Sequence, residues 1–472
     1  MVEKKLNCNS SRLIFLAAAS LMVMGAKKVV KEDLNSHSEL DYQSYDCYRA
    51  IEYAGKNIKT AAELITLMKR GEKFSISKRY HDGIFTLLAK EFLYCREQNK
   101  PLFPDELEKK YPLPPAAVNE NEVSDFNKFI EIVKKYNSPV DYACEINSFL
   151  YDENIDKRID EIRKMPVPPA NFFSILGRLV EIGRSNSFKN GYLTIGQFKN
   201  IEDYNNFMQR IFYMMVIAVE NELSSKSADD NKLAKHLLSF AAIPHFLNYY
   251  DGVHKLIKLE AKKNYYYCLR KALANCNFNN KQLNNLLDVT AELSKEDYLE
   301  FIIDDNRVFI IENYSYKYDE FKKKLNCEKE NYAERLFYNH VYKCFKKSRE
   351  LESAIRKPFL KINFSSDEPS YYDINFQSEF WCGGYFTKMF EEVYEDRFLN
   401  RCSKIALAIE IYKRSHKNNV PKTLDDLVPK YLSKIPKDPF SGEKINYQKE
   451  QSGYSITSAV YQGKQIIYKI EK

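Results

Sequence analysis

Apolar residues recur at three- and four-residue steps through residues 228–314, and this spacing constrains the fold more than any other feature of the sequence. Leu233, Leu237, Phe240 and Ala241 all fall on one face of a helix drawn with this period. The turn pair at 251–252 interrupts the period, which resumes at Val253 and continues to Ala274. Closely spaced helices with short connections pack as antiparallel neighbours. We therefore expect an irregular array of helical hairpins.

Composition agrees with a mainly α-helical fold. The chain has 472 residues, which exceeds what one hydrophobic core usually serves, so two or three domains are expected. Only 14 residues are Gly, whereas 29% are charged and 44% are hydrophobic, a balance that favours long helices over Gly-rich β folds. Further helical patterns occupy residues 60–69, 77–95, 126–136 and 201–223, separated by proline-rich breaks at 101–104, 112–115 and 165–169.

Changes in composition divide the chain. The expected domains are a signal peptide or membrane anchor at 1–26, a polar tether at 27–41, a helical body at 42–357 with a sub-boundary considered near 165–200, an irregular connector at 358–384, and a C-terminal module at 385–472. Within the connector, Trp381 is expected to anchor the packing between regions. The C-terminal module is predicted to be α+β, with a long helix, a short helix and an antiparallel hairpin sheet.

The N-terminal stretch predicts export. Lys4, Lys5 and Arg12 precede the apolar run Leu13–Ala26, which ends at Lys27 and Lys28. This run is shorter than the roughly 20 residues of a membrane span, and a basic lead before a short apolar core is typical of a secretory signal. An uncleaved anchor is the alternative. In either case we expect the protein to be exported across the inner membrane. It would then be periplasmic, or anchored in the inner membrane and facing the periplasm.

The distribution of charges along the chain limits the classes of binding partner that we expect. The 72 basic and 65 acidic residues are interspersed, and no run of five like charges occurs, so no nucleic-acid partner is expected. Another envelope protein is the expected partner, and the membrane is a second one if the leader stays attached.

No residue pattern predicts a catalytic, cofactor or metal site. Nine cysteines follow the leader without CxxC spacing, which excludes a disulfide framework or a zinc motif, and Cys268 and Cys276 are interpreted as buried apolar residues. His81 and His236 are predicted on helix surfaces, and His245 and His254 have no metal-binding partner at helical spacing. Phosphate-binding loops and the nucleophile-elbow motif are missing from the sequence.

Three pairs of adjacent carboxylates were considered as acid and base. They are Asp304-Asp305, Glu391-Glu392 and Asp425-Asp426. Adjacent helical residues point about 100° apart, so such pairs do not form a catalytic dyad. The last pair is expected in the first turn of a short helix opened by Pro421 and Thr423, where the helix dipole favours negative charge. The sequence therefore predicts no catalytic residue and no cofactor, and leaves open whether the protein is an enzyme.

The C-terminal stretch Lys404–Ile470 has an ordered set of signals. A long helix ends in polar residues, Pro421 opens a short helix, and Asp438-Pro439 turns the chain toward strands around 445–447, 453–457 and 465–470, with a turn at Gln462-Gly463. This order resembles the globular domain of the major pseudopilin of type II secretion. Together with the helical array, and with the patterns LLxxxxELSKEDYLEF and DDNRVF, it also resembles a group of uncharacterised exported bacterial proteins.

Two departures limit what this resemblance implies. Major pseudopilins often bind calcium in the loop that corresponds to Ala459–Lys464, but here the loop has no carboxylate and contains a lysine, so no calcium site is expected. The apolar assembly helix of pilins is replaced by Gly25-Ala26-Lys27-Lys28, which argues against assembly into a fibre.

These observations lead to one expected function and two alternatives. We expect an exported helical envelope protein that acts by protein–protein interaction or as a scaffold rather than as an enzyme. It could instead be an accessory component of a type II secretion or pilus-like system that docks through its C-terminal module. The third reading is an envelope hydrolase whose acidic residues converge only in the folded chain.

Overall fold

The computed structural model describes residues 51–53, 56–57, 66–72, 75–76, 84–111, 120–135, 166–169, 171–177, 201–225, 229–246, 252–294, 299–308, 311, 345–346, 348–362, 384–461 and 463–471. The chain forms two compact units. The smaller comprises Met1–Phe103, Arg307–Ser348 and Ser365–Phe386, and the larger comprises Pro104–Asn306, Arg349–Phe364 and Thr387–Lys472. The predicted leader, tether and most of the connector, including Trp381, lie outside the described residues.

The smaller unit contains a minor sheet that the sequence pattern does not predict. Strands β1 (Ile51–Tyr53), β2 (Lys56–Asn57) and β3 (Ser75–Ile76) pair antiparallel in the order β2-β1-β3. Strands of two or three residues are too short to display the alternation that identifies a strand. Helix α3 (Ile84–Glu97) follows, and its Glu91 carboxylate pairs with Arg307 Nε at 2.9 Å, with both side chains fully buried.

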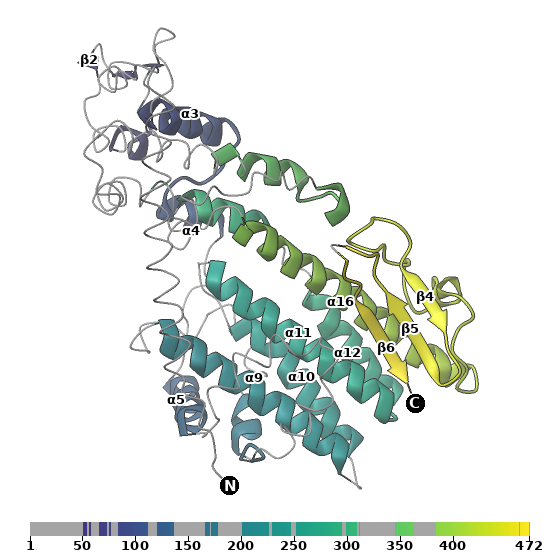
Figure 1. Cartoon of the computed structure of the whole chain (residues 1–472). Coiled ribbons are helices and arrows are strands. Elements are labelled where there is room, and N and C mark those ends of the chain that lie inside the picture. Colours follow the sequence, from purple (N-terminus) through teal and green to yellow (C-terminus); the bar gives the residue numbers. More distant parts are fainter. Residues whose placement is uncertain are drawn as a thin grey trace, which may run out of the picture. The chain divides into compact units, whose positions relative to one another are not determined.

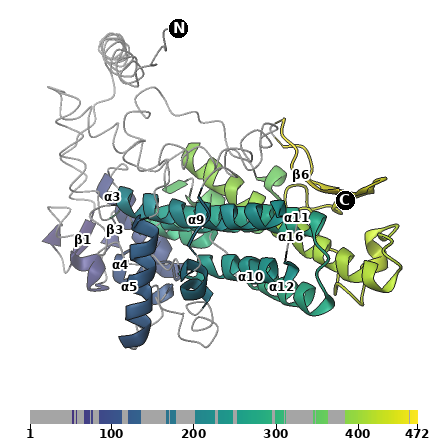
Figure 2. The ribbon, with the colours of Figure 1, turned by 90° about the horizontal axis from the view of Figure 1, so that it is seen from below.

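The larger unit is built on the predicted helical array. Its helices include α4 (Pro104–Lys110), α5 (Glu120–Lys135), α9 (Ile201–Ser224), α10 (Asp230–Phe246), α11 (Gly252–Asn275) and α12 (Asn280–Glu292). Helix α10 contacts α9, α11 and α12, and α9 also contacts α11 (Figures 1 and 2). The mainly helical fold with antiparallel hairpins is thus confirmed.

The observed bounds match the prediction closely for α9 but not for α5, which begins at Glu120 and not at the predicted residue 126. The apolar run 211–219 in α9 is buried throughout. The Asn279 side chain caps α12 by accepting from the Gln282 amide, while the Gln282 side chain accepts from the Asn279 amide. No helix within the described ranges is long and apolar enough to cross a membrane.

The C-terminal module consists of helix α16 (Gly384–Ser415) and a three-stranded antiparallel sheet. Strands β4 (Asn446–Lys449), β5 (Gly453–Thr457) and β6 (Ile467–Glu471) pair in sequence order. Cross-strand neighbours Tyr454 and Ile470, and Ile456 and Tyr468, are buried on one face. The Tyr454 hydroxyl donates to the Ala406 carbonyl of α16 at 3.4 Å, and β6 also lies against α11 (Figure 1).

The short helix predicted after Pro421 is reduced to one 3-10 turn, η6 (Leu424–Leu427). Val428 leaves the turn in an extended conformation (φ −100°, ψ 139°), because the following Pro429 disfavours helical geometry at the preceding residue. The described part of the predicted turn agrees with the prediction: the Tyr461 and Lys464 backbones exchange hydrogen bonds of 2.8 Å, and Gly463 has φ +75°.

The first residues of the expected connector, which was predicted to be irregular, fold as a 3-10 turn and complete the core of this module. The amides of Phe359 and Leu360, in the 3-10 turn η5 (Phe359–Lys361), donate to the carbonyls of Pro439 and Phe440 at 3.1 and 2.9 Å. The Phe359 ring lies 5.6 Å from the ring of Phe440 and 5.8 Å from that of Tyr461. Nothing in the local sequence around Phe359 indicates this docking, because the partner residues are about 80 positions away.

Candidate functional site

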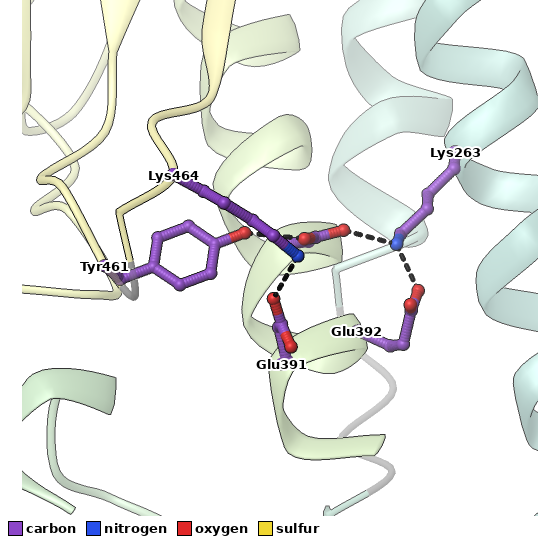
Figure 3. A network of polar contacts seen from close by, with 6 residues as sticks. Lys263, Glu391, Glu392, Tyr461 and Lys464 are labelled. Atoms are coloured by element: carbon purple, nitrogen blue, oxygen red, sulfur yellow. Dashed lines mark hydrogen bonds and ion pairs between the residues drawn. The ribbon is translucent and has the colours of Figure 1, made fainter. Parts of the chain in front are cut away.

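A network of charged side chains joins the helical array to the C-terminal sheet. We call it the junction network; it consists of Lys263 on α11, Glu391, Glu392 and Glu395 on α16, and Tyr461 and Lys464 in the loop between β5 and β6 (Figure 3). All six residues belong to the larger unit. Segments separated by about two hundred residues in sequence thus meet at one cluster of charges.

Lys263 and Tyr461 approach the acidic helix from opposite sides. Lys263 Nζ forms ion pairs with Glu392 and, at 2.6 Å, with Glu395 Oε2. The second oxygen of Glu395 accepts a 2.6 Å hydrogen bond from the Tyr461 hydroxyl (Figure 3). Glu395 therefore links α11 to the β5–β6 loop through α16.

The helical geometry of α16 determines which glutamate pairs with Lys263 and which pairs with Lys464. Glu392 and Glu395 are three residues apart and share a face, so both reach Lys263. Glu391 points elsewhere and pairs with Lys464 at 3.4 Å. The predicted divergence of Glu391 and Glu392 is confirmed, and the two do not form a dyad.

The ion pairs of Lys263 are more buried than the ion pair of Lys464, so we expect them to contribute more to stability. The Lys263 side chain is 11% exposed, whereas that of Lys464 is 67% exposed. Burial alone would lower the pKa of Lys263, but the carboxylates of Glu395 and Glu392 outweigh it and raise the pKa, so the ammonium form is retained. Burial and the charge of Glu395 raise the pKa of Tyr461, which keeps its hydroxyl protonated as a donor.

A second polar layer lies beside the junction network. Lys262 Nζ donates to the Leu293 carbonyl at 2.8 Å and lies 3.7 Å from Asp396 Oδ2. The Asn400 amide donates to the Tyr266 hydroxyl at 3.0 Å and to the Thr290 carbonyl at 2.8 Å. These contacts hold α11, the end of α12 and α16 in fixed positions relative to one another.

Glu260 lies one turn before Lys263. Its Oε1 atom is buried and accepts no hydrogen bond within the described part of the chain, although the residue as a whole is only half-buried. Burial raises its pKa to about 8; Lys263 opposes this shift and Glu392 adds to it. Because Lys263 is already held by Glu392 and Glu395, the neutral form of Glu260 is favoured at neutral pH.

The other carboxylate pairs serve structural contacts. Asp304 is buried and accepts from Lys110 Nζ and from the Tyr111 hydroxyl, each at 2.7 Å. Asp425 pairs with Lys444 at 2.7 Å, and Asp426 Oδ2 accepts from the Thr423 amide at 3.0 Å at the start of η6. The expected place of this pair in a first turn is confirmed.

The prediction for His236 is wrong. It is buried rather than on a helix surface, with its ring 4.3 Å from that of Phe173. Burial, followed by the charge of Lys232, lowers its pKa to about 4, against a smaller opposing effect of Glu222. His236 lies three residues after Leu233 and four before Phe240, which is the helical spacing of the buried face, and its polar ring obscured this signal. His81 and the side chains of His245 and His254 lie outside the described residues.

The cysteines behave as buried apolar residues where the structure describes them. Cys95, Cys268, Cys276 and Cys402 are buried free thiols. Burial raises the thiol pKa of Cys268 and of Cys402, which suppresses the reactive thiolate. Among the described side chains no group of three or more His, Cys, Asp and Glu is placed to hold a metal ion.

The chemical capacity of the junction network is therefore that of a clamp. A general acid or base must reach a substrate atom, but Glu392 and Glu395 are directed into Lys263 and Tyr461. Comparison with protein-family models, with curated proteins and with solved structures finds no match.

Proposed function

We propose that the chain is an exported envelope protein that acts by binding other proteins, as a scaffold, and not by catalysis. The proposal combines the leader-like segment Leu13–Ala26 with a mainly helical fold in which Asp304, Glu392 and Glu395 are engaged in internal contacts.

The observation that carries the proposal is the junction network. Lys263, Glu392, Glu395 and the neutral Tyr461 connect the array and the sheet into one body, and both carboxylates are engaged within the protein. A scaffold needs a rigid arrangement of surfaces, and buried ion pairs with hydrogen bonds specify such an arrangement. An enzyme needs charges that remain available to a substrate.

Export and partner binding are tested on the full chain in a bacterial host. We expect the protein in the envelope fraction, and we expect crosslinking there to capture a defined envelope protein. A variant that lacks residues 1–26 is the matched control, because it should stay in the cytoplasm and lose that partner. Purely cytoplasmic fractionation of the full chain, with no crosslinked partner, would refute the proposal.

A role beside a type II secretion or pilus-like system is the second candidate. It is supported by the observed order of a long helix, a short turn and a three-stranded sheet, and by the exposed outer strand β4. A strand at a sheet edge offers backbone groups to a partner strand.

This second candidate has its own experiment. A photo-crosslinker at the exposed position Gln448 on β4 should capture a secretion pseudopilin, whereas one at exposed Lys281 on α12 should not. Equal capture at both positions, or capture at neither, together with normal secretion in a deletion strain, would exclude docking through the sheet.

A further inference from the structure

The far end of α16 presents a compact group of aromatic and basic side chains. We call it the tail tip, and its members are Tyr412, His416, Lys417, Lys430, Tyr431 and Lys434. The His416 ring stacks on the Tyr412 ring at 3.7 Å with an interplanar angle of 2°. The Tyr431 ring meets Tyr412 edge-on at 5.6 Å, so residues before and after η6 are held together.

Hydrogen bonds hold this aromatic group in place. The Ser415 hydroxyl lies 2.6 Å from the Tyr431 hydroxyl and 3.0 Å from His416 Nδ1. Lys417 and Asn418 then adopt left-handed backbone conformations (φ 53° and 63°), which end α16 and turn the chain back. The tail tip is therefore a fixed turn rather than a chance grouping of side chains.

The tail tip carries excess positive charge. Residues 412–434 include six Lys and Arg but only two Asp and no Glu. The two acids are engaged, since Asp425 pairs with Lys444 and Asp426 accepts the Lys422 and Thr423 amides. The charge is spaced along the sequence, so no run of lysines reveals it.

Two of the six basic side chains are used inside the protein, and four face outward. Lys413 pairs with Glu410, and Arg414 donates to the Phe278 carbonyl. The remaining four are exposed: Lys417, Lys422, Lys430 and Lys434. The described residues offer none of these four a carboxylate partner, and Lys430 Nζ lies over the Tyr431 ring, 5.0 Å from its centre.

Apolar surface accompanies this charge. Val428, two residues before Lys430, is 37% exposed, and Tyr412 and Tyr431 are half-buried. Tyrosines at the level of lipid headgroups, with lysines whose stems lie along apolar surface, are typical of protein surfaces that rest on a bilayer. Each lysine close to an anionic bilayer contributes about 1 kcal/mol of attraction.

We propose that the tail tip binds the surface of a bilayer that contains anionic phospholipid. Charge complementarity and the exposed valine between lysines favour a lipid surface over a folded acidic protein, which would need a matching concave contact. This inference goes beyond the proposed scaffold function and does not depend on it, because it concerns the purified chain and lipid alone.

The test measures sedimentation of the full chain with vesicles of phosphatidylcholine, with or without phosphatidylglycerol. The variant Lys417→Glu/Lys430→Glu/Lys434→Glu is compared with Lys109→Glu/Lys271→Glu/Lys281→Glu, which has the same net charge but alters α4, α11 and α12. The N-terminal apolar run is common to both variants, so any binding through it cancels in the comparison. Thermal melting confirms that both variants are folded.

We expect the tail-tip variant to lose at least about tenfold in partition onto phosphatidylglycerol vesicles, with the control variant near wild type. Raising the salt concentration from about 0.1 M to about 1 M should remove the difference, because screening shortens the reach of the lysines. Equal partition of the two variants would overturn the proposal. So would wild-type binding that is the same on neutral vesicles, or tighter retention on duplex DNA or an acidic protein than on anionic vesicles.

Discussion

His236 shows how a single buried side chain makes the fold sensitive to acid. Its pKa is about 4 in the folded protein and 6.5 in an ordinary setting, so the unfolded chain binds more protons between these values. Stability should therefore fall as pH falls from 6.5 towards 4, by about 3 kcal/mol for this residue. In His236→Leu, urea unfolding followed by circular dichroism should show a smaller loss over the same window.

Exposed His416 provides the control for that measurement. His416→Gln should keep the full acid sensitivity, because its ring is at the surface. If the unfolding free energies of wild type and His236→Leu run parallel from pH 6.5 to 4, the burial of His236 does not explain the effect.

Glu260 has the opposite pH dependence. Its pKa is raised from 4.5 to about 8, so its contribution to stability is fully present below 4.5 and is lost as pH rises through 8. Glu260→Gln retains the neutral shape and should be more stable than wild type at about pH 9, by about 2 kcal/mol after allowance for its partial exposure. At low pH the two proteins should melt alike. Glu443→Gln, an exposed change, should not alter the pH profile, and a profile unchanged by Glu260→Gln would contradict the assignment.

At the scale of elements, the sequence predicts helices well and their partners poorly. The expected helix at 201–223 is observed as Ile201–Ser224, and the strand at 453–457 has the predicted bounds. Both have long or clean periodic patterns, which report the buried face directly. The Phe359 docking and the pairing of Lys263 with Glu395 lack such a signal, because periodicity identifies a face but not what covers it.

Two contacts of the β5–β6 loop, made by Tyr461 and by Lys464, should contribute differently to stability and can be compared by mutation. Tyr461→Phe keeps the ring against Phe440 but removes the 2.6 Å bond to half-buried Glu395, which should cost about 1–2 kcal/mol. Lys464→Ala removes a pair whose lysine is largely exposed, so it should cost under about 0.5 kcal/mol. Chemical denaturation of both variants checks this order. A larger loss of unfolding free energy in Lys464→Ala would show that the exposed pair of Lys464 and Glu391, and not the Tyr461–Glu395 hydrogen bond, attaches the loop.

At the scale of the larger unit, the C-terminal sheet and the helical array share one core. Tyr468 on β6 is buried beside Ser403 on α16, β6 lies against α11, and Lys263 ties α11 to α16. A module predicted from residues 404–470 therefore depends on residues that precede it by more than a hundred positions. Sequence similarity of a tail cannot indicate such dependence, since the covering helix is not part of the motif.

This shared core predicts cooperative behaviour that hydrogen exchange can measure. Lys263→Met removes the cation from the carboxylates of Glu392 and Glu395, whose side chains are 32% and 19% exposed, and this should cost about 2–3 kcal/mol. Because the sheet rests on both helices, amide protection should fall together in α11 and in β5. Lys281→Met, at an exposed position of α12, should change neither. Loss of protection in β5 with α11 unaffected would mean that the sheet opens as an independent unit. If the amide protection of α11 and β5 recovers in Lys263→Met/Glu392→Gln/Glu395→Gln, the coupling is due to the charges of the junction network.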